Sequence, residues 1–163
     1  MRIIKAQKNS KDCIICGMEN SLGVQAPFFE LQDGRIASVF QFKKEHQSYP
    51  GRVHGGMITA MLDELAGRVL WITQPDIYAV TTSLEVKFHK PVPYNVDLKA
   101  VGEISVDTRR AYEAKAKIMD MDGVVLASAV VKYFKMDKSL IASEDMDEQM
   151  IYDIDTKIED IDV

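Results

Sequence analysis

Residues 52–68 read RVHGGMITAMLDELAGR, a segment in which a histidine and two glycines precede an apolar stretch. At about 100° per residue, the large apolar side chains of this stretch fall in one stripe with the spacing of a buried helix face. The stripe consists of Ile58, Met61, Leu62, Leu65 and Val69. The sequence therefore predicts a long helix over residues 57–70 that buries one face.

Two adjacent carboxylates, Asp63 and Glu64, lie outside that stripe. Glu64 precedes Arg68 by four residues, the favourable order for an ion pair on a helix surface, and we interpret the two as such a pair. Asp63 lies among small residues and has no basic partner within the helix. The residues alone leave two roles open for Asp63: a polar contact across a helix or subunit interface, or a carboxylate that a substrate can reach.

The helix entry, His54-Gly55-Gly56, has the composition of a site where a ligand meets the backbone. Glycines let a ligand approach closely, and the N–H groups of a first helical turn have no partner within the helix. Such a terminus can bind an anion or polarise a carbonyl group. Equally, two glycines at a loop–helix junction can form only a turn, and a single histidine can be structural.

Strand patterns occupy both sides of this helix. Residues 28–42 hold two apolar runs around Asp33-Gly34, which is a strong hairpin signal. Residues 78–93 alternate, and the face that we expect to be buried carries Val80, Thr82, Leu84, Val86 and Phe88. Three more strand-like segments cover residues 96–105, 109–120 and 124–136, with a turn at Asp122-Gly123 between the last two.

This order of elements predicts an α+β fold in which one curved antiparallel β-sheet wraps around one long central α-helix. Strands and helices do not alternate, which argues against a doubly wound parallel sheet. The chain has 163 residues, 47% of them hydrophobic, and is long enough for one domain with a real core. We assign this domain to residues 1–138.

Residues 139–163 differ from the domain in charge, with nine acidic residues against one lysine. The net charge of this tail is therefore −8. Because the net charge of the whole chain is −5, residues 1–138 have a net charge of +3. We expect a solvated acidic tail with a helical turn near residues 146–154, because blocks of like charge resist packing. A mildly positive domain suits an anionic small molecule, and the bias is too weak to indicate nucleic acid.

The chain starts with a polar stretch that does not resemble a signal peptide, and no apolar run approaches the roughly 18–20 residues needed to span a bilayer. We therefore expect a cytoplasmic protein that does not bind membranes. Its two cysteines, Cys13 and Cys16, are too few for a disulfide framework.

A Cys-x-x-Cys pair can be half of a zinc site or a redox pair. Zinc would need two more ligands, and the chain has only three histidines, His46, His54 and His89. A redox motif would be expected in a βαβ setting, which the pattern lacks. We favour a tight loop formed with the help of Gly17, Asn20 and Gly23.

Several of these features occur together in one known family. A His-Gly-Gly entry, an apolar helix with an acid nine positions after the histidine, and a long alternating strand that ends at Pro91 closely resemble the hotdog-fold acyl-CoA thioesterases. The resemblance covers roughly residues 10–136 and is strongest to the branch of phenylacetic-acid-pathway thioesterases. The segment CIICGMENSLG at residues 13–23 also resembles a stretch that precedes the hotdog core in some relatives.

The resemblance implies an acyl-CoA thioesterase with catalytic roles for four residues. Asp63 would be the general base or the nucleophile, and the Gly55 N–H would polarise the thioester carbonyl. His54 would shape the turn, and Thr81 would help to hold the attacking water. Further residues expected to bind substrate are Gly56 at the turn, Gln47 in the preceding loop and, for the coenzyme A phosphates, the basic residues Arg52, Lys90, Arg109 and Arg110.

We expect no metal and no separate cofactor, because no nucleotide-binding glycine motif or metal-ligand cluster is apparent and coenzyme A enters as part of the substrate. At about 1.5 Å of helical rise per residue, Asp63 lies roughly 9–12 Å from the Gly55-Gly56 turn, too far for both to reach one thioester carbonyl. We therefore expect a homodimer with antiparallel helices and shared sites, which can pair further into a homotetramer.

Three rival interpretations remain. The chain can be a non-catalytic acyl-CoA-binding or sensing protein that uses the same pocket. It can be a hotdog dehydratase, although those enzymes use a histidine about five residues from the helix Asp and none follows Asp63 on the helix. Finally, the acidic tail can mark an interaction module with a vestigial site.

Overall fold

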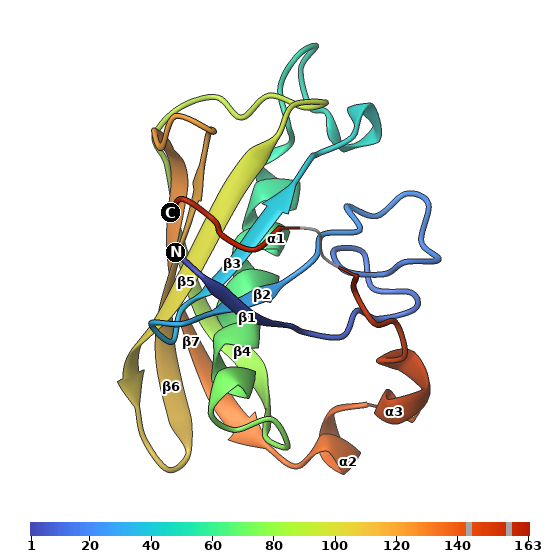
Figure 1. The fold of residues 1–163 in the computed structure, drawn as a ribbon, viewed down its shortest axis with the longest axis vertical. Coiled ribbons are helices and arrows are strands. Elements are labelled where there is room, and N and C mark those ends of the chain that lie inside the picture. The colour runs from blue at the N-terminus through green and yellow to red at the C-terminus, as the bar shows by residue number, and fades with distance from the viewer. Residues whose placement is uncertain (143–144, 156–157) are drawn as a thin grey trace.

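The computed structural model describes residues 1–142, 145–155 and 158–163, and within them one antiparallel sheet has the strand order β1-β2-β3-β5-β6-β7-β4 (Figure 1). The strands are β1 (Ile3–Ala6), β2 (Phe29–Leu31), β3 (Ile36–Phe40), β4 (Tyr78–Phe88), β5 (Leu98–Asp107), β6 (Ala111–Met119) and β7 (Val125–Met136). The helices are η1 (Lys44–His46), α1 (Gly55–Arg68), η2 (Val69–Ile72), α2 (Lys138–Ile141) and α3 (Met146–Gln149).

Helix α1 contacts β3, β4, β5, β6 and β7, so the sheet curves around it (Figure 1). This is the hotdog fold, and the predicted α+β architecture is confirmed. The predicted apolar stripe of α1 and η2 is also confirmed, because each of its members is at most 4% exposed: Ile58, Met61, Leu62, Leu65 and Val69. None of the described helices is both long and apolar enough to cross a bilayer.

The sheet meets the helix with small residues. Ala100, Ala114, Ala127 and Ala129 are all buried on its inner face. A side chain at Gly102 would have its Cβ only 3.2 Å from carbon atoms of both Ile36 and Val69. These small residues let the backbone of the sheet come close to α1.

Both predicted hairpin turns are confirmed. Gly34 connects β2 and β3 with a φ of +83°, and Gly123 connects β6 and β7 with a φ of +85°. Residues with a side chain rarely adopt such values, which explains why glycine follows aspartate at both turns.

The prediction of a fully buried face on β4 is wrong in part. Leu84 and Val86 are half-buried, whereas Thr82 is exposed and Phe88 is 56% exposed. Strand β4 is an edge strand that pairs only with β7, and the pairing register shifts between Thr81 and Ser83. An edge strand in a single chain lacks the second neighbour that would cover its outer part.

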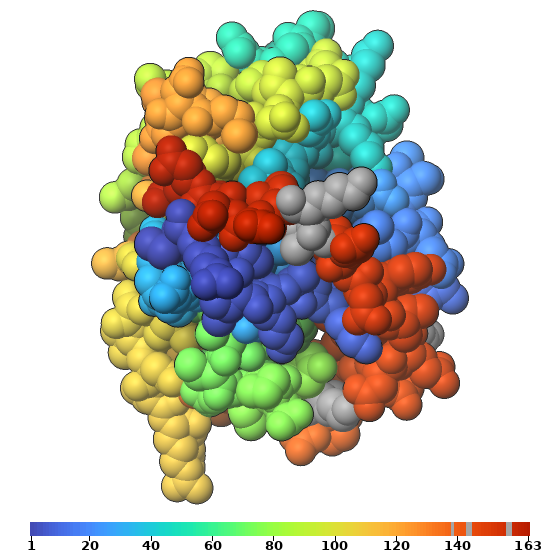
Figure 2. All heavy atoms as spheres, viewed as in Figure 1, coloured from blue at the N-terminus to red at the C-terminus, as the bar shows by residue number. Residues whose placement is uncertain are grey.

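The two ends of the described chain lie together, which the sequence did not predict. Strand β1 pairs with β2, and the amino group of Met1 donates a hydrogen bond of 2.7 Å to the Ile161 carbonyl. Ile161 is only 2% exposed and packs on Phe29 and Leu31. Figure 2 shows the red C-terminal segment lying beside the dark blue N-terminal one.

A purely solvated tail is therefore wrong at Ile161, because this apolar side chain is buried in a cluster with Phe29 and Leu31 of β2 and Ala37 of β3. The predicted helical turn is confirmed as α3. The division into residues 1–138 and 139–163 stays a prediction, and Glu144 and Lys157 of the tail lie outside the described residues.

Candidate active site

The Asp63 carboxylate is held by two hydroxyl groups. Thr81 Oγ1 and the Tyr133 hydroxyl each donate to Asp63 Oδ1 at 2.9 Å, and the Tyr133 hydroxyl also lies 2.7 Å from the Asp63 carbonyl oxygen. Among the residues that the structure describes, none donates to Oδ2. One carboxylate oxygen is thus fixed in position while the other remains available to accept a proton or contact a substrate.

The fold explains this arrangement. Thr81 on β4 and Tyr133 on β7 are direct partners in the strand pairing, so both side chains leave the same face of the sheet. Asp63 lies on the part of α1 that crosses this strand pair, outside the apolar stripe. Two hydroxyls from neighbouring strands therefore converge on one carboxylate.

Thr81, which the resemblance named as a residue that holds the attacking water, lies beside Asp63, whereas sequence reasoning missed Tyr133. The alternation of β7, in which Ala129, Val131 and Tyr133 are buried, contained a signal that the tyrosine faces the helix. Its ring stacks on Tyr112, with ring centres 4.6 Å apart. Burial and the Asp63 carboxylate raise the pKa of Tyr133 far above that of free tyrosine, so its hydroxyl remains a hydrogen-bond donor.

A cavity of about 170 Å³ opens beside Asp63. Its lining combines polar and aromatic side chains from α1, η2, β4, β6 and β7: Asp63, Glu64, Gly67, Arg68, Leu70, Trp71, Tyr78, Ala79, Thr81, Tyr112 and Tyr133. Small-molecule sites usually measure roughly 300–1,000 Å³, so this cavity holds a few waters or a small group but not a whole acyl-CoA.

The start of α1 forms a second cluster of predicted site residues. His54 is the N-cap, and its Nδ1 accepts a hydrogen bond of 2.9 Å from the Gly56 N–H. A Cβ at Gly56 would lie 3.0 Å from that nitrogen, so only glycine fits without displacing the ring. The Gly55 N–H makes no hydrogen bond within the described chain, and the exposed ring of Phe88 on β4 lies beside Gly55.

The loop before the helix lies against this cluster. The backbone N–H of His54 donates to the His46 carbonyl at 2.8 Å, and Gln47 forms a β-bridge with Val53. The Gln47 side chain is exposed.

The structure does not bring all predicted residues together in one chain. The cavity at Asp63 and Thr81 includes neither His54 nor Gly55 nor Gly56, which lie about two helical turns away. The four basic residues also divide into two pairs, all exposed. Arg52 and Lys90 flank the hydrogen bond between Val53 and Val92 near the helix start, and Arg109 and Arg110 form the turn between β5 and β6.

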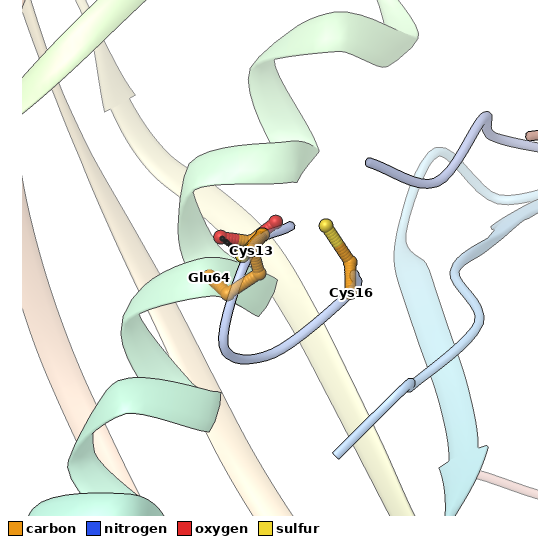
Figure 3. Close-up of side chains that lie close together, drawn as sticks. All are labelled: Cys13, Cys16 and Glu64. Carbon is orange, nitrogen blue, oxygen red and sulfur yellow. Dashed lines mark hydrogen bonds between the residues drawn. The ribbon is translucent and has the colours of Figure 1, made fainter. Parts of the chain in front are cut away.

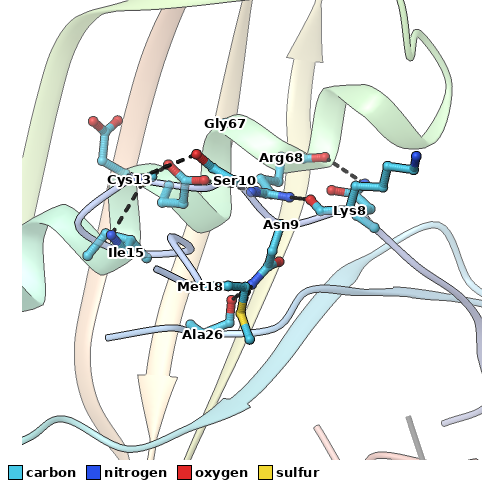
Figure 4. Close-up of polar contacts among 12 residues, drawn as sticks. Lys8, Asn9, Ser10, Cys13, Ile15, Met18, Ala26, Gly67 and Arg68 are labelled. Carbon is cyan, nitrogen blue, oxygen red and sulfur yellow. Dashed lines mark hydrogen bonds and ion pairs between the residues drawn. The ribbon is translucent and has the colours of Figure 1, made fainter. Parts of the chain in front are cut away.

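The predicted ion pair of Glu64 and Arg68 is confirmed, but its predicted place on the helix surface is wrong, because Arg68 is buried. Its Nε lies 2.9 Å from Glu64 Oε1 and its Nη1 donates to the Lys8 carbonyl at 2.7 Å (Figure 4). Its guanidinium lies 4.5 Å from the centre of the Phe28 ring. Burial alone would lower the pKa of Arg68, but the Glu64 carboxylate and the Cys16 side chain together more than offset this and raise it. The N-terminal segment covers this side of α1, which helical spacing alone does not reveal.

The Cys13–Gly23 segment forms the predicted tight loop. The Gly17 N–H donates to the Cys13 carbonyl at 2.8 Å, and the Asn20 side chain donates to the Asp12 carbonyl at 3.1 Å. The Gly23 N–H donates to the Asn20 carbonyl at 3.0 Å. The loop places Cys13 and Cys16 against Glu64 of α1, a third potential ligand that counting histidines had not considered (Figure 3).

Comparison with known proteins finds a family that matches part of the chain. Residues 50–127 match the family model of the thioesterase superfamily. This region of the chain belongs to the thioesterase superfamily. It contains the helix start, Asp63 and Thr81, while Tyr133 lies beyond it.

The relatives found for this chain are distant. The chain is 32% identical over 77 residues to the acyl-coenzyme A thioesterase THEM4 of Rattus norvegicus, an alignment that covers 47% of this chain and 32% of THEM4. The chain thus spans about a third of the length of that curated relative.

Solved structures show the same fold. The thioesterase superfamily protein RHA08564 is 24% identical, with a TM-score of 0.70 over 76% of this chain and 63% of that one. A Bacillus halodurans protein solved with CoA is also 24% identical, with a TM-score of 0.63 over 71% of this chain and 76% of that one. The predicted superfamily is confirmed, and assignment to the phenylacetic-acid branch stays a prediction.

Proposed function

We propose that this protein is an acyl-CoA thioesterase that hydrolyses the thioester of a coenzyme A conjugate to the free acid and CoA. The observation that carries the proposal is the Asp63 carboxylate beside a cavity, held at Oδ1 by two hydroxyls while no described residue donates to Oδ2. The superfamily, the name of the rat relative and the CoA bound in the Bacillus halodurans structure support this chemistry.

In this proposal Asp63 Oδ2 directs attack on the thioester carbonyl carbon in one of two ways. As a general base it removes a proton from water, whose oxygen bonds to that carbon; as a nucleophile it bonds to the carbon itself, and water then cleaves the anhydride. In either case the C–S bond breaks and CoA leaves as a thiolate that takes up a proton. The Thr81 hydroxyl, which donates to Oδ1, still has lone pairs that can accept a hydrogen bond from the water.

The Gly55 N–H supplies the second element, a donor for the oxygen that becomes negative in the transition state. Its lack of an internal partner and its place at a helix N-terminus suit this role. His54 fixes the turn by capping Gly56, which leaves the Gly55 N–H pointing out of the helix.

Because the two elements lie at separate points of α1, we propose that each active site is shared between two chains of a homodimer. Antiparallel packing of two α1 helices about a twofold axis would bring Asp63 of one chain to Gly55 of the other, twice. It would also enlarge the small cavity and bring the Arg52 and Lys90 pair near the Arg109 and Arg110 pair, where together they can bind CoA phosphates. The unpaired edge of β4 is available for such an interface.

The decisive experiment measures release of free thiol from a panel of acyl-CoA esters of different chain length and aromatic character. Turnover of at least one ester supports the proposal. Tight binding of an acyl-CoA without thiol release would instead identify a non-catalytic binding protein. A single turnover in heavy-oxygen water tests the nucleophilic role of Asp63, because an anhydride that water attacks at the aspartyl carbon transfers an unlabelled Asp63 oxygen to the first product.

Mixed dimers test the shared site. We expect Asp63→Asn and Gly55→Pro chains to be nearly inactive alone, the latter because proline removes the N–H donor. Co-expression should restore about a quarter of wild-type activity, since about half of randomly paired dimers are mixed and each has one intact site of two. The folding of both parents is checked by circular dichroism. A mixture no more active than its parents would place each site within one chain.

A further inference from the structure

A second group of reactive side chains lies next to Asp63 and has no role in the proposed hydrolysis. The sulfur atoms of Cys13 and Cys16 and a carboxylate oxygen of Glu64 lie within 4.8 Å of one another (Figure 3). Cys16 is 1% exposed, whereas Cys13 and Glu64 are half-buried and leave a path for an ion. We propose that these three residues bind a zinc ion, with solvent in the fourth position.

The donor set suits zinc in type and distance. Zinc binds thiolate sulfur at about 2.3 Å and carboxylate oxygen at about 2.0–2.2 Å, which puts the ligand atoms of a tetrahedral site roughly 3.4–3.8 Å apart. Cys13 Sγ already lies 3.9 Å from Glu64 Oε2. Small side-chain rotations are therefore enough to close the three atoms around one ion.

The backbone of the cysteine loop holds both sulfur atoms near Glu64. The Ile15 N–H donates to Cys13 Sγ at 3.4 Å, an interaction that stabilises negative charge on the sulfur. The Gly17 N–H donates to the Cys13 carbonyl at 2.8 Å, and a Cβ at Gly17 would lie only 2.3 Å from that oxygen. A glycine is therefore required directly after Cys16 for the loop to turn both sulfurs toward α1.

Arg68 completes the charge balance. Two thiolates and one carboxylate around a divalent ion leave one net negative charge. The buried guanidinium of Arg68, whose Nε lies 2.9 Å from Glu64 Oε1, neutralises it. It binds Glu64 Oε1 and so turns Oε2 toward Cys13. Such outer partners orient the ligands of metal sites in many proteins.

A disulfide between Cys13 and Cys16 is the competing use of the same sulfurs. It would engage two of the three groups and leave the Glu64 carboxylate beside the bridge without a part in it. Zinc uses all three. The ion would link the N-terminal loop to α1 at Glu64. Glu64 and Asp63 both line the same cavity.

The test uses the full chain, purified under reducing conditions, stripped with a chelator and titrated with Zn²⁺ or Co²⁺. We expect about one ion per chain and, for Co²⁺, the near-ultraviolet charge-transfer absorption of a cobalt–thiolate bond. Cys13→Ser and Cys16→Ser should abolish this absorption, and Glu64→Gln should weaken binding at least about tenfold.

The matched control is Asp63→Asn, which changes the adjacent carboxylate and should bind zinc as the wild type does. Because this variant is expected to lose hydrolysis, it separates the metal proposal from the proposed function. Zinc should also raise the melting temperature of the wild type but not of Cys13→Ser. The proposal is overturned by a wild-type chain with two free thiols and no bound zinc, by a mass two hydrogens lower that reveals a disulfide, or by zinc binding that survives in Cys13→Ser.

Discussion

Asp63 and Glu64 are neighbours on α1, yet their surroundings are opposite. Asp63 faces β4 and β7, where two neutral hydroxyls hold Oδ1, and Oδ2 has no donor among the described residues. Glu64, about 100° further around the helix, faces the N-terminal segment and pairs with a buried arginine. A carboxylate held by neutral donors keeps its charge available for chemistry, whereas one paired with a buried cation is committed to structure.

The largest effect expected is the loss of hydrolysis in Asp63→Asn. We expect kcat to fall about 100- to 10,000-fold, the usual range for removal of a general base. Unfolding free energy should change by less than about 1 kcal/mol, because the amide oxygen still accepts from Thr81 and Tyr133. Thiol-release kinetics and urea unfolding measure the two quantities.

The matched control for this variant is Glu85→Gln, an exposed carboxylate on β4 that should leave both quantities unchanged. Should Asp63→Asn keep half of the wild-type rate, or unfold, the division of roles between the two neighbouring carboxylates would be wrong.

Glu64→Gln should show the opposite behaviour and destabilise the fold. In chelator-treated protein we expect a loss of about 2 kcal/mol in unfolding free energy, less than the roughly 3–5 kcal/mol for a fully buried pair because Glu64 is partly exposed. Urea unfolding measures this loss.

Asp33→Asn serves as its control, since Asp33 pairs with Arg35 near the surface and should contribute under about 1 kcal/mol. Equal losses in the two variants would mean that Arg68 does not depend on Glu64 for its charge partner.

The smallest effect is expected for Tyr133→Phe, which removes one of the two donors on Asp63. We expect kcat/KM to fall about tenfold and unfolding free energy to fall by about 1 kcal/mol. Tyr112→Phe is the matched control, because the Tyr112 hydroxyl donates to the Gly67 carbonyl and not to Asp63. It should cost similar stability and leave the rate nearly intact, so equal rate losses would contradict the positioning role of Tyr133.

Local patterns gave much of this fold correctly. The apolar stripe of α1, the two Asp-Gly turns and the strands β2 to β7 depend on neighbouring residues in the chain, whose periodicity and turn chemistry are readable in one dimension. The errors have a common cause. The burial of Arg68, the cover over Ile161 and the exposure of Phe88 all depend on which distant segment lies alongside.

The sequence by itself determined the central helix, its histidine–glycine entry and the position of Asp63 outside the apolar stripe, because a helix converts spacing directly into direction. Only the tertiary structure decided what Asp63 and its neighbour meet. Tyr133 lies 70 residues beyond Asp63, and Cys13 lies 51 residues before Glu64. Contacts over such separations arise from strand pairing and loop packing. These bring the hydroxyls of Thr81 and Tyr133 to one side of α1 and the thiols of Cys13 and Cys16 to the other.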